Sequence, residues 1–330
     1  MWLPSGLPML ENLKLLKTIS RPEFLPANLS SLVMGLAWSI DPARNGSVLE
    51  AGLLAGLVLA VLTFVSAIGA QLNTLSDREL DSKEPRKQYL VKALDALGQG
   101  KLKRILIFEF LVSLPFFIVL ISVQPKLVLV LLWVFGHFLA YAYSVAPIRL
   151  KSRSWLAMLS LLLVLSILPV SFVYFAFTNG VTPLFLLFLA GQAMSVYAVI
   201  VPTETRDYWI DKANGVKTMT VWLGLVRASM LAIVLLSVGG VFMVTAFAFA
   251  VSMKLPFLAV SLLAIFVADF VILRNYRTLY GLSKQFSLTR DDSVAERIVE
   301  LSARNPRWIN LAQQSILIMA LALLAAKFLT

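Results

Sequence analysis

The sequence predicts an all-α protein that crosses a membrane nine times. Of its 330 residues, 59% are hydrophobic and only 14% are charged, and the mean hydropathy is +0.84. Soluble domains are about 45–50% apolar and about 25% charged, so a water-soluble fold is excluded. The apolar residues also gather in segments that are long enough to span a bilayer, and the charged residues collect between them.

Nine apolar segments account for the predicted helices, because about 20 apolar residues span the hydrocarbon core. In chain order they are 27–41, 51–73, 105–123, 127–145, 155–177, 183–203, 225–248, 255–273 and 309–329. Residues 1–23 carry Lys14, Lys17 and Arg21 between leucines. A signal peptide has its basic residues before the apolar core, so this stretch is expected to form an interfacial amphipathic helix.

The distribution of positive charge predicts the orientation. The chain has 29 Lys and Arg, and all fall on one side of the nine spans except Arg44, Lys126, Lys254 and Lys327. By the positive-inside rule, the N-terminus lies in the cytoplasm and the C-terminus on the opposite side. No linker rich in Gly, Ser or Pro separates the halves, so residues 1–330 are expected to form a single membrane domain.

The rare residue types restrict the chemistry. The chain has no Cys and one His, His137. Thiol nucleophiles, Cys-ligated zinc and multi-histidine metal sites are therefore excluded, and any metal has oxygen ligands. The net charge of +11 follows from the cytoplasmic loops, so no nucleic-acid partner is expected.

A first group of oxygen-bearing side chains ends the second span. Asn73, Asp77 and Asp81 are spaced i, i+4, i+8, which places them on one helical face. Stacked carboxylates there favour a cation, and Mg²⁺ accepts one or two carboxylates together with water and phosphate oxygens. The alternative is a solvated helix end stabilised by charge pairs such as Glu79 with Lys83.

A second acidic group ends the sixth span. Asp207 and Asp211 are spaced i, i+4, and Glu204 precedes them. Both groups are expected to face one central cavity that opens to the cytoplasm, with 74–104 and 204–220 as active-site loops. Basic residues accompany both groups: Arg78, Arg86, Lys87, Arg149, Lys151, Arg153, Arg206, Lys212 and Lys217. Carboxylates with Lys and Arg at a membrane face are what a diphosphate–Mg²⁺ complex requires, although topology alone also places basic residues there.

Four motifs resemble those of the UbiA superfamily of intramembrane prenyltransferases. NTLSDRELD, from residue 73, resembles the family's NDxxDxxxD, and DYWIDKANGVKT, from residue 207, resembles its second Asp-rich motif. YAYSVAPIRLKS, from residue 141, is similar to the family's Tyr-Ser-x-x-Pro-x-Arg-x-Lys stretch, and SRPEFLPANL, from residue 20, to its entry to helix 1. Nine helices are also the family's architecture.

The resemblance implies Mg²⁺-dependent transfer of an isoprenyl group from an isoprenyl diphosphate to a hydrophobic acceptor. Breaking the C–O bond leaves an allylic cation, which aromatic faces can stabilise. The resemblance implies that the metal ligands and catalytic residues are Asp77, Asp81, Asp207 and Asp211, with Asn73 as a further metal ligand. It implies that the diphosphate is bound by Asn73, Arg21, Arg149, Lys151 and Lys217. It also implies that the allylic cation is stabilised by Tyr141, Tyr143 and Tyr197.

The sequence also departs from the family pattern. Thr74 stands where the first motif usually has Asp, and SKEPRKQYL, from residue 82, is more similar to the carotenoid-elongating branch that includes lycopene elongases. The acceptor therefore stays open among a polyene, a quinone-type ring and a lipid. Two alternatives remain: a UbiA-type terpene cyclase that needs no acceptor, and an ion-coupled transporter, which would place its acids near the bilayer midplane.

Overall fold

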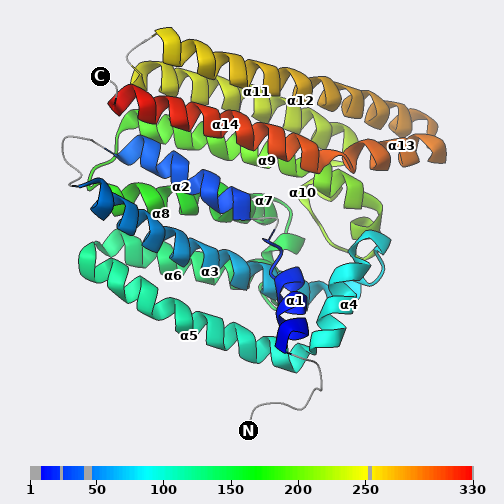
Figure 1. Ribbon diagram of the computed structural model, residues 1–330. Helices are drawn as coiled ribbons and strands as arrows, with labels where there is room; N and C mark the ends of the chain where they lie inside the picture. The colour runs from blue at the N-terminus through cyan, green and yellow to red at the C-terminus, as the bar shows by residue number, and fades with distance from the viewer. Residues whose placement is uncertain (1–8, 23–24, 41–46, 252–254, 329–330) are drawn as a thin grey trace. The chain divides into compact units, whose positions relative to one another are not determined.

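The computed structural model describes residues 9–22, 25–40, 47–251 and 255–328, and every named element within them is a helix (Figure 1). In order these are α1 (Met9–Ile19), α2 (Leu25–Ser39), α3 (Val48–Asp81), η2 (Pro85–Lys87), α4 (Gln88–Leu97), α5 (Gln99–Val123), α6 (Leu127–Ser144), η3 (Leu150–Ser152), α7 (Trp155–Leu162), η4 (Leu163–Ile167), α8 (Leu168–Phe177), α9 (Pro183–Ala213), α10 (Met219–Leu223), α11 (Leu225–Ala250), α12 (Leu255–Thr289), α13 (Asp292–Ser302) and α14 (Asn305–Phe328). The all-α prediction is confirmed.

Within the described ranges, eight helical stretches are long and apolar enough to cross a membrane. The remaining predicted segment, 27–41, corresponds to α2, whose 15 residues extend only about 22 Å against a hydrocarbon core of about 30 Å. The nine-span prediction thus holds approximately. Arg44 and Lys254, which entered the charge count, lie outside the described residues, as do 1–8 and 23 of the predicted N-terminal helix.

The predicted span 155–177 is built from α7, η4 and α8, and η4 is a π-helical turn. Pro169 is the second residue after this turn. Proline has no N–H and its ring meets the carbonyl of the preceding turn, which explains why the regular α-helical ladder is interrupted here.

The segments 74–104 and 204–220, which were predicted to be loops, are mostly helical. Residues 74–81 belong to α3, and most of the rest of 74–104 lies in η2, α4 and α5. Residues 204–213 belong to α9, and 219–220 begin α10. Hydropathy marks where a helix leaves the apolar layer, whereas the backbone hydrogen bonds of a helix continue for as long as helix-forming residues follow.

The chain divides into two compact units, and each is described here by itself: Met1–Asn28 with Gly56–Arg149, and Leu29–Ala55 with Leu150–Thr330. The single domain that the sequence predicts stays a prediction.

In the first unit, α3 and α6 approach each other along small residues. A Cβ added to Gly69 would lie 3.5 Å from that of Ala140, and one added to Gly136 would lie 3.8 Å from Cγ1 of Val65. Small residues allow membrane helices to pack this closely. At the next turn of both helices, Asn73 Nδ2 donates to Ser144 Oγ at 3.3 Å, so the packed stripe ends at the first acidic group.

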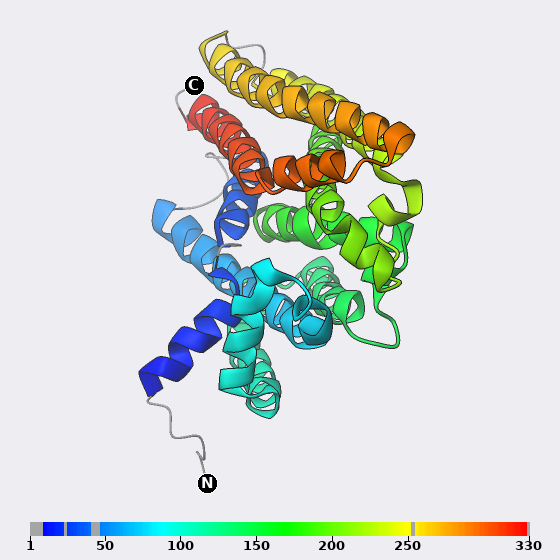
Figure 2. The ribbon, with the colours of Figure 1, turned by 90° about the vertical axis from the view of Figure 1, so that its right-hand side faces the viewer.

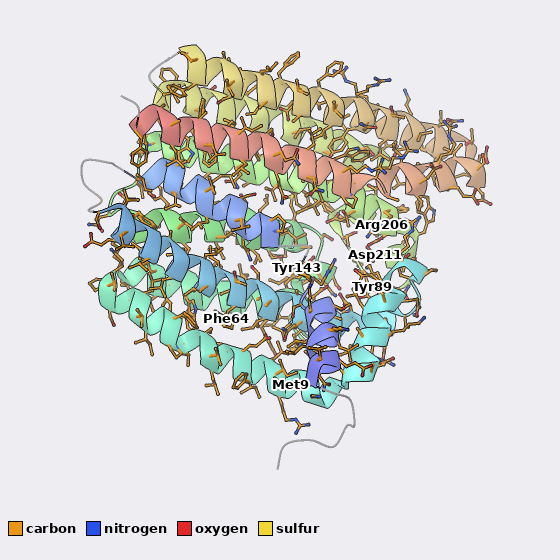
Figure 3. The ribbon with its side chains drawn as sticks, in the orientation of Figure 1. Met9, Phe64, Tyr89, Tyr143, Arg206 and Asp211 are labelled. Carbon is orange, nitrogen blue, oxygen red and sulfur yellow. The ribbon has the colours of Figure 1, made fainter. Side chains whose placement is uncertain are left out.

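The N-terminal helix α1 belongs to this unit and packs against α4 (Figure 2). Ile19 of α1 joins a buried apolar cluster with Leu94 and Leu97 of α4 and Leu102 of α5. The opposite face of α1 exposes Met9 (labelled in Figure 3), and with it Lys14 and Lys17. A helix is confirmed in this region, and its interfacial position stays a prediction.

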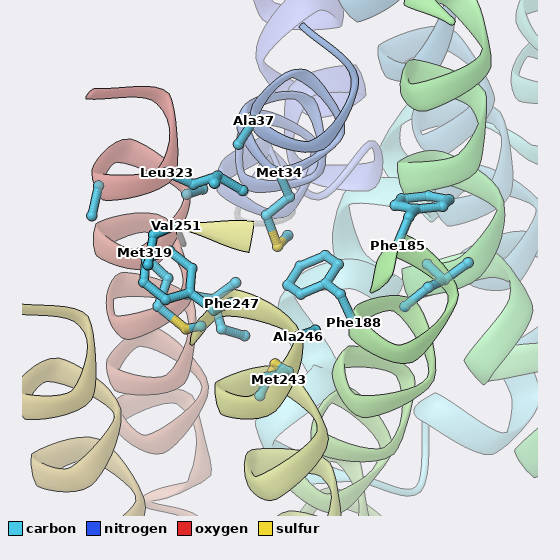
Figure 4. Close-up of a cluster of buried hydrophobic side chains, with 14 of the residues drawn as sticks. Met34, Ala37, Phe185, Phe188, Met243, Ala246, Phe247, Val251, Met319 and Leu323 are labelled. Carbon is cyan, nitrogen blue, oxygen red and sulfur yellow. The ribbon is translucent and has the colours of Figure 1, made fainter. Parts of the chain in front are cut away.

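In the second unit, α9, α11, α12 and α14 lie side by side (Figure 1). The backbones of α9 and α11 come close at Gly191 and Gly239, where a Cβ on Gly239 would lie 2.6 Å from the Gly191 carbonyl oxygen. An apolar cluster adds Met34 and Ala37 of α2 to side chains of α9, α11 and α14 (Figure 4). The apolar cluster and the glycine contact together hold α9, which carries the second acidic group.

Candidate active site

The first acidic group lies on the last two turns of α3. Asn73 and Asp77 share a helical face, because Asn73 Nδ2 donates to Asp77 Oδ2 at 3.0 Å. Asp77 and Asp81 are 7% and 4% exposed, which is unusual for carboxylates and requires charged or polar partners. Both acids are thus held at a span end with little access to bulk water.

Two basic side chains supply ion-pair partners. Arg149 Nη2 lies 3.3 Å from Asp77 Oδ1, and Lys87 Nζ lies 3.2 Å from Asp81 Oδ1. Arg149 has a φ of 37°, a backbone conformation that non-glycine residues seldom adopt and that marks functional sites more often than average. Of these two cations, the resemblance assigned a substrate role only to Arg149. Lys87 was one of nine neighbouring basic residues, and its contact depends on the turn through η2.

Arg21 follows α1 and has a φ of 52°. Its neighbour Ser20 accepts a hydrogen bond from Gln71 Nε2 at 2.9 Å, and the same amide nitrogen donates to Glu109 Oε2 at 2.8 Å. No role was predicted for Gln71, which is fully buried on α3. Sequence reasoning could have found Gln71 because a glutamine within a predicted membrane span needs polar partners inside the protein.

The final turn of α3 is also tied to α4. Arg78 Nε and Nη2 form a paired contact with Asp95, at 2.6 Å to Oδ1 and 2.9 Å to Oδ2. The hydrogen bond from Arg78 lowers the pKa of Asp95 below its usual value. This surface pair positions the helix that follows the first acidic group, and it occupies Arg78 with Asp95 rather than with an acid of the first motif.

The second acidic group lies on the last two turns of α9 (Arg206 and Asp211 in Figure 3). Arg206 forms a paired contact with the adjacent Asp207, at 2.7 Å from Nε and 3.0 Å from Nη2. Asp211 is 8% exposed, and its carbonyl accepts from Val216 N at 2.9 Å. Between them Gly215 has a φ of 71°, where a side chain would be strained, so glycine permits the chain to reverse beside Asp211.

A short backbone contact places basic residues beside this reversal. Arg153 and Lys217 form a parallel bridge, and Ser154 N donates to Lys217 O at 2.6 Å. Lys151 is buried in η3, and Lys217 is exposed. The second unit therefore brings together two of the basic residues to which the resemblance assigned diphosphate binding, with Lys217 following the second acidic group directly.

The three predicted cation-stabilising tyrosines occupy different environments. Tyr141 is 45% exposed and Tyr143 (labelled in Figure 3) is half-buried, both near the end of α6. Tyr197 is fully buried in an apolar cluster, and its hydroxyl donates to Glu204 Oε1 at 3.1 Å. Its contacts are those of a packing residue, and the cation-stabilising role of all three stays a prediction.

The aspartates of each acidic group form a pair of carboxylates that suits a metal ion with oxygen ligands. Among the described residues, no group of three or more His, Cys, Asp or Glu side chains is close enough to hold a metal alone. Each motif instead supplies two Asp carboxylates one helical turn apart. Mg²⁺ is commonly bound in this way, by one or two carboxylates with substrate phosphates and water completing its shell. The donor set thus fits Mg²⁺ with a phosphorylated substrate better than a metal held by protein alone.

The described helices define a multi-pass membrane protein, and the two acidic span ends are its candidate sites for a cation. The model of the UbiA prenyltransferase family matches residues 29–287. The chain therefore belongs to this family of prenyltransferases and is an integral multi-pass membrane protein. No curated protein sequence matches it.

Solved structures share the fold. A UbiA homologue from Archaeoglobus fulgidus bound to DMAPP and Mg²⁺ is 17% identical, with a TM-score of 0.57 over 90% of this chain and 98% of that chain. The same homologue bound to GPP and Mg²⁺ gives a TM-score of 0.58 at 17% identity, over 90% of this chain and 99% of that one. A structure described for digeranylgeranylglyceryl phosphate synthase gives 0.60 at 15% identity, over 94% and 99%.

Proposed function

We propose that this protein transfers an isoprenyl group from an isoprenyl diphosphate to a lipophilic acceptor in the membrane, and that both acidic groups supply Mg²⁺ ligands for this reaction. The observation that carries the proposal is the pairing of acids with arginines at two span ends, Asp77 with Arg149 and Asp207 with Arg206. Each pair combines a carboxylate for a metal with a guanidinium that can bind phosphate oxygens. A solvated helix end needs neither burial nor this pairing.

In the reaction, the bond between C1 of the prenyl chain and the diphosphate oxygen breaks, and the electron pair leaves with the diphosphate. C1 then bonds to the acceptor, which loses a proton. Bound Mg²⁺ supplies charge stabilisation for the leaving diphosphate. The protein's part would be to hold Mg²⁺ through Asp77 and Asp81 at one span end and through Asp207 and Asp211 at the other, and to direct cations towards charge that grows in the transition state.

Those cations are Arg21, Arg149, Lys151 and Lys217, and Asn73 adds an amide oxygen to the first acidic group. With substrate present, Arg149 exchanges its contact with Asp77 for one with a phosphate oxygen. The relatives that were solved with DMAPP or GPP and Mg²⁺ support this substrate class. The acceptor is a polyene, a quinone-type ring or a lipid, and the motifs face the cytoplasm with the N-terminus inside.

The test is to incubate the purified protein with geranylgeranyl diphosphate and Mg²⁺, with and without each acceptor class, and to identify the products. A prenylated acceptor supports transfer. Diphosphate release with a cyclic hydrocarbon and no acceptor would select the cyclase instead. Activity that persists unchanged in EDTA would refute the metal-dependent mechanism.

A further inference from the structure

The buried carboxylate of Glu204, which precedes the two aspartates on α9, accepts three hydrogen bonds. Its Oε1 accepts from the Tyr197 hydroxyl at 3.1 Å. Its Oε2 accepts from Thr220 N at 3.0 Å and from Thr220 Oγ1 at 2.9 Å. Glu204 is 8% exposed, and Tyr197 and Thr220 are 0% exposed. A buried carboxylate with three donors is an anchor between the segments that supply those donors.

The segments joined here are α9 and the start of α10. Glu204 and Tyr197 belong to α9, whereas Thr220 is in the first turn of α10. Thr218, the N-cap of α10, accepts from Val221 N at 3.3 Å, so this end of α10 is fixed by two side chains at once. Along the chain, the reversal 214–218, in which Lys217 lies, joins the end of α9 to the start of α10.

We propose that Glu204 is a positioning residue that holds this reversal so that Lys217 faces the diphosphate. The inference rests on the proposed function, because Lys217 needs a phosphorylated ligand to face. Lys217 is itself exposed, and it is fixed through its backbone, which bridges Arg153 and accepts from Ser154 N at 2.6 Å. Val216 N holds the near side of the reversal to the Asp211 carbonyl of α9, and Thr220, three residues after Lys217, holds its far side to Glu204 of the same helix.

Two substitutions of Glu204 distinguish the effect of its hydrogen bonds from the effect of its charge. In Glu204→Gln, the amide oxygen can still accept both bonds from Thr220, and the amide nitrogen can donate to the Tyr197 hydroxyl, which also accepts. In Glu204→Met, a side chain of similar length accepts no hydrogen bond, so all three bonds to the carboxylate are lost. Gln is therefore expected to preserve the anchor and Met to release it.

Two measurements test this on the full-length protein in detergent. The first is the rate of trypsin cleavage after Lys217, which reports the freedom of the reversal without any substrate. The second is the binding of inorganic diphosphate in the presence of Mg²⁺, together with KM and kcat for geranylgeranyl diphosphate. For Glu204→Met we expect faster cleavage, at least about fivefold weaker binding and a matching rise in KM, while kcat changes less. For Glu204→Gln we expect values close to those of the wild type.

Tyrosine variants supply a milder test and a matched control. Tyr197→Phe removes one of the three donors and keeps the ring, so it should fold and show a smaller change in the same direction. Tyr276 is also fully buried in the same apolar cluster, but its hydroxyl donates to Ala198 O at 2.9 Å. Tyr276→Phe should leave cleavage after Lys217 and diphosphate binding unchanged.

Three results would overturn the inference. One is unchanged cleavage and binding in both Glu204→Met and Tyr197→Phe. Another is faster cleavage with unchanged binding, which would mean that the anchored reversal does not serve the diphosphate. The third is equal effects of Tyr197→Phe and Tyr276→Phe. Failure of the wild type to bind diphosphate with Mg²⁺ would instead refute the proposed function, and the cleavage assay would still report on the anchor.

Discussion

The glycine contact between α9 and α11 yields a prediction whose size follows from the coordinates. A Cβ at position 239 would lie 2.6 Å from both the Gly191 carbonyl oxygen and Ser195 Oγ, whereas ordinary contact begins at 3.4 Å. Gly239→Ala therefore requires a displacement of about 0.8 Å, the difference between these distances. The carbonyl is backbone within a span, so α9 itself must move. Overpacking of this kind costs about 1–3 kcal/mol, against about 0.5–1 kcal/mol in favour of Ala in a helix.

Two other helical glycines, Gly240 of α11 and Gly281 of α12, provide matched controls. A Cβ at Gly240 would meet Asp269 Oδ2 at 2.6 Å, which is the end of a flexible side chain, and one at Gly281 meets nothing within 4 Å. In thermal unfolding of the protein in detergent, only Gly239→Ala should have a lower Tm, and its prenyl diphosphate turnover should fall because α9 carries Asp207 and Asp211. Equal Tm values for Gly239→Ala and Gly240→Ala would refute the close packing of α9 and α11.

Three further predictions address the span ends. Arg149→Ala should raise KM for the prenyl diphosphate about tenfold or more, because a hydrogen bond to a charged group is lost, and an unchanged KM would contradict its binding role. Asp95→Asn should lower the Tm near pH 7. The difference from wild type should begin to shrink as the pH falls below about 4, because Arg78 lowers the pKa of Asp95 in the folded state and the stabilisation is lost as the pH falls through that lowered pKa. A difference that does not shrink at all as the pH falls below about 4 would exclude this pair as its source. Trp209→Ala, but not Trp209→Phe, should weaken the activation of the enzyme by Mg²⁺. The reason is that the Trp209 ring, whose centroid lies 5.7 Å from that of Phe286, holds the end of α9. Equal Mg²⁺ dependence in both variants would refute this role.

The membrane-spanning architecture was predictable because it depends on local composition. Runs of apolar residues of sufficient length have few alternatives to a spanning helix, and eight of the nine segments meet the length that a span requires. The helix ends were less predictable. The segment 74–104, which includes Asp81, was expected to be a loop, yet helix α3 continues to Asp81, because the hydropathy pattern reports the surroundings of a segment and not its backbone conformation.

The partners of the site residues depend on contacts that sequence spacing cannot supply. The i, i+4 spacing predicted that Asn73 and Asp77 would lie together, and the hydrogen bond between them agrees. The contact of Lys87 with Asp81 depends on the turn through η2, and that of Thr220 with Glu204 depends on the reversal after α9. The resemblance predicted that Tyr197 stabilises a cation. The sequence could not show that the Tyr197 hydroxyl donates a hydrogen bond to Glu204.

The most direct test of the account is the rate of Mg²⁺-dependent diphosphate release from geranylgeranyl diphosphate by Asp77→Asn and Asp211→Asn, one variant for each acidic group. Both variants keep the size of the side chain and remove a metal-binding charge. We predict that each loses more than about 100-fold in rate while Asp95→Asn, whose acid binds Arg78, retains wild-type activity. Release at the wild-type rate by either Asp77→Asn or Asp211→Asn would contradict the claim that both acidic groups serve one reaction.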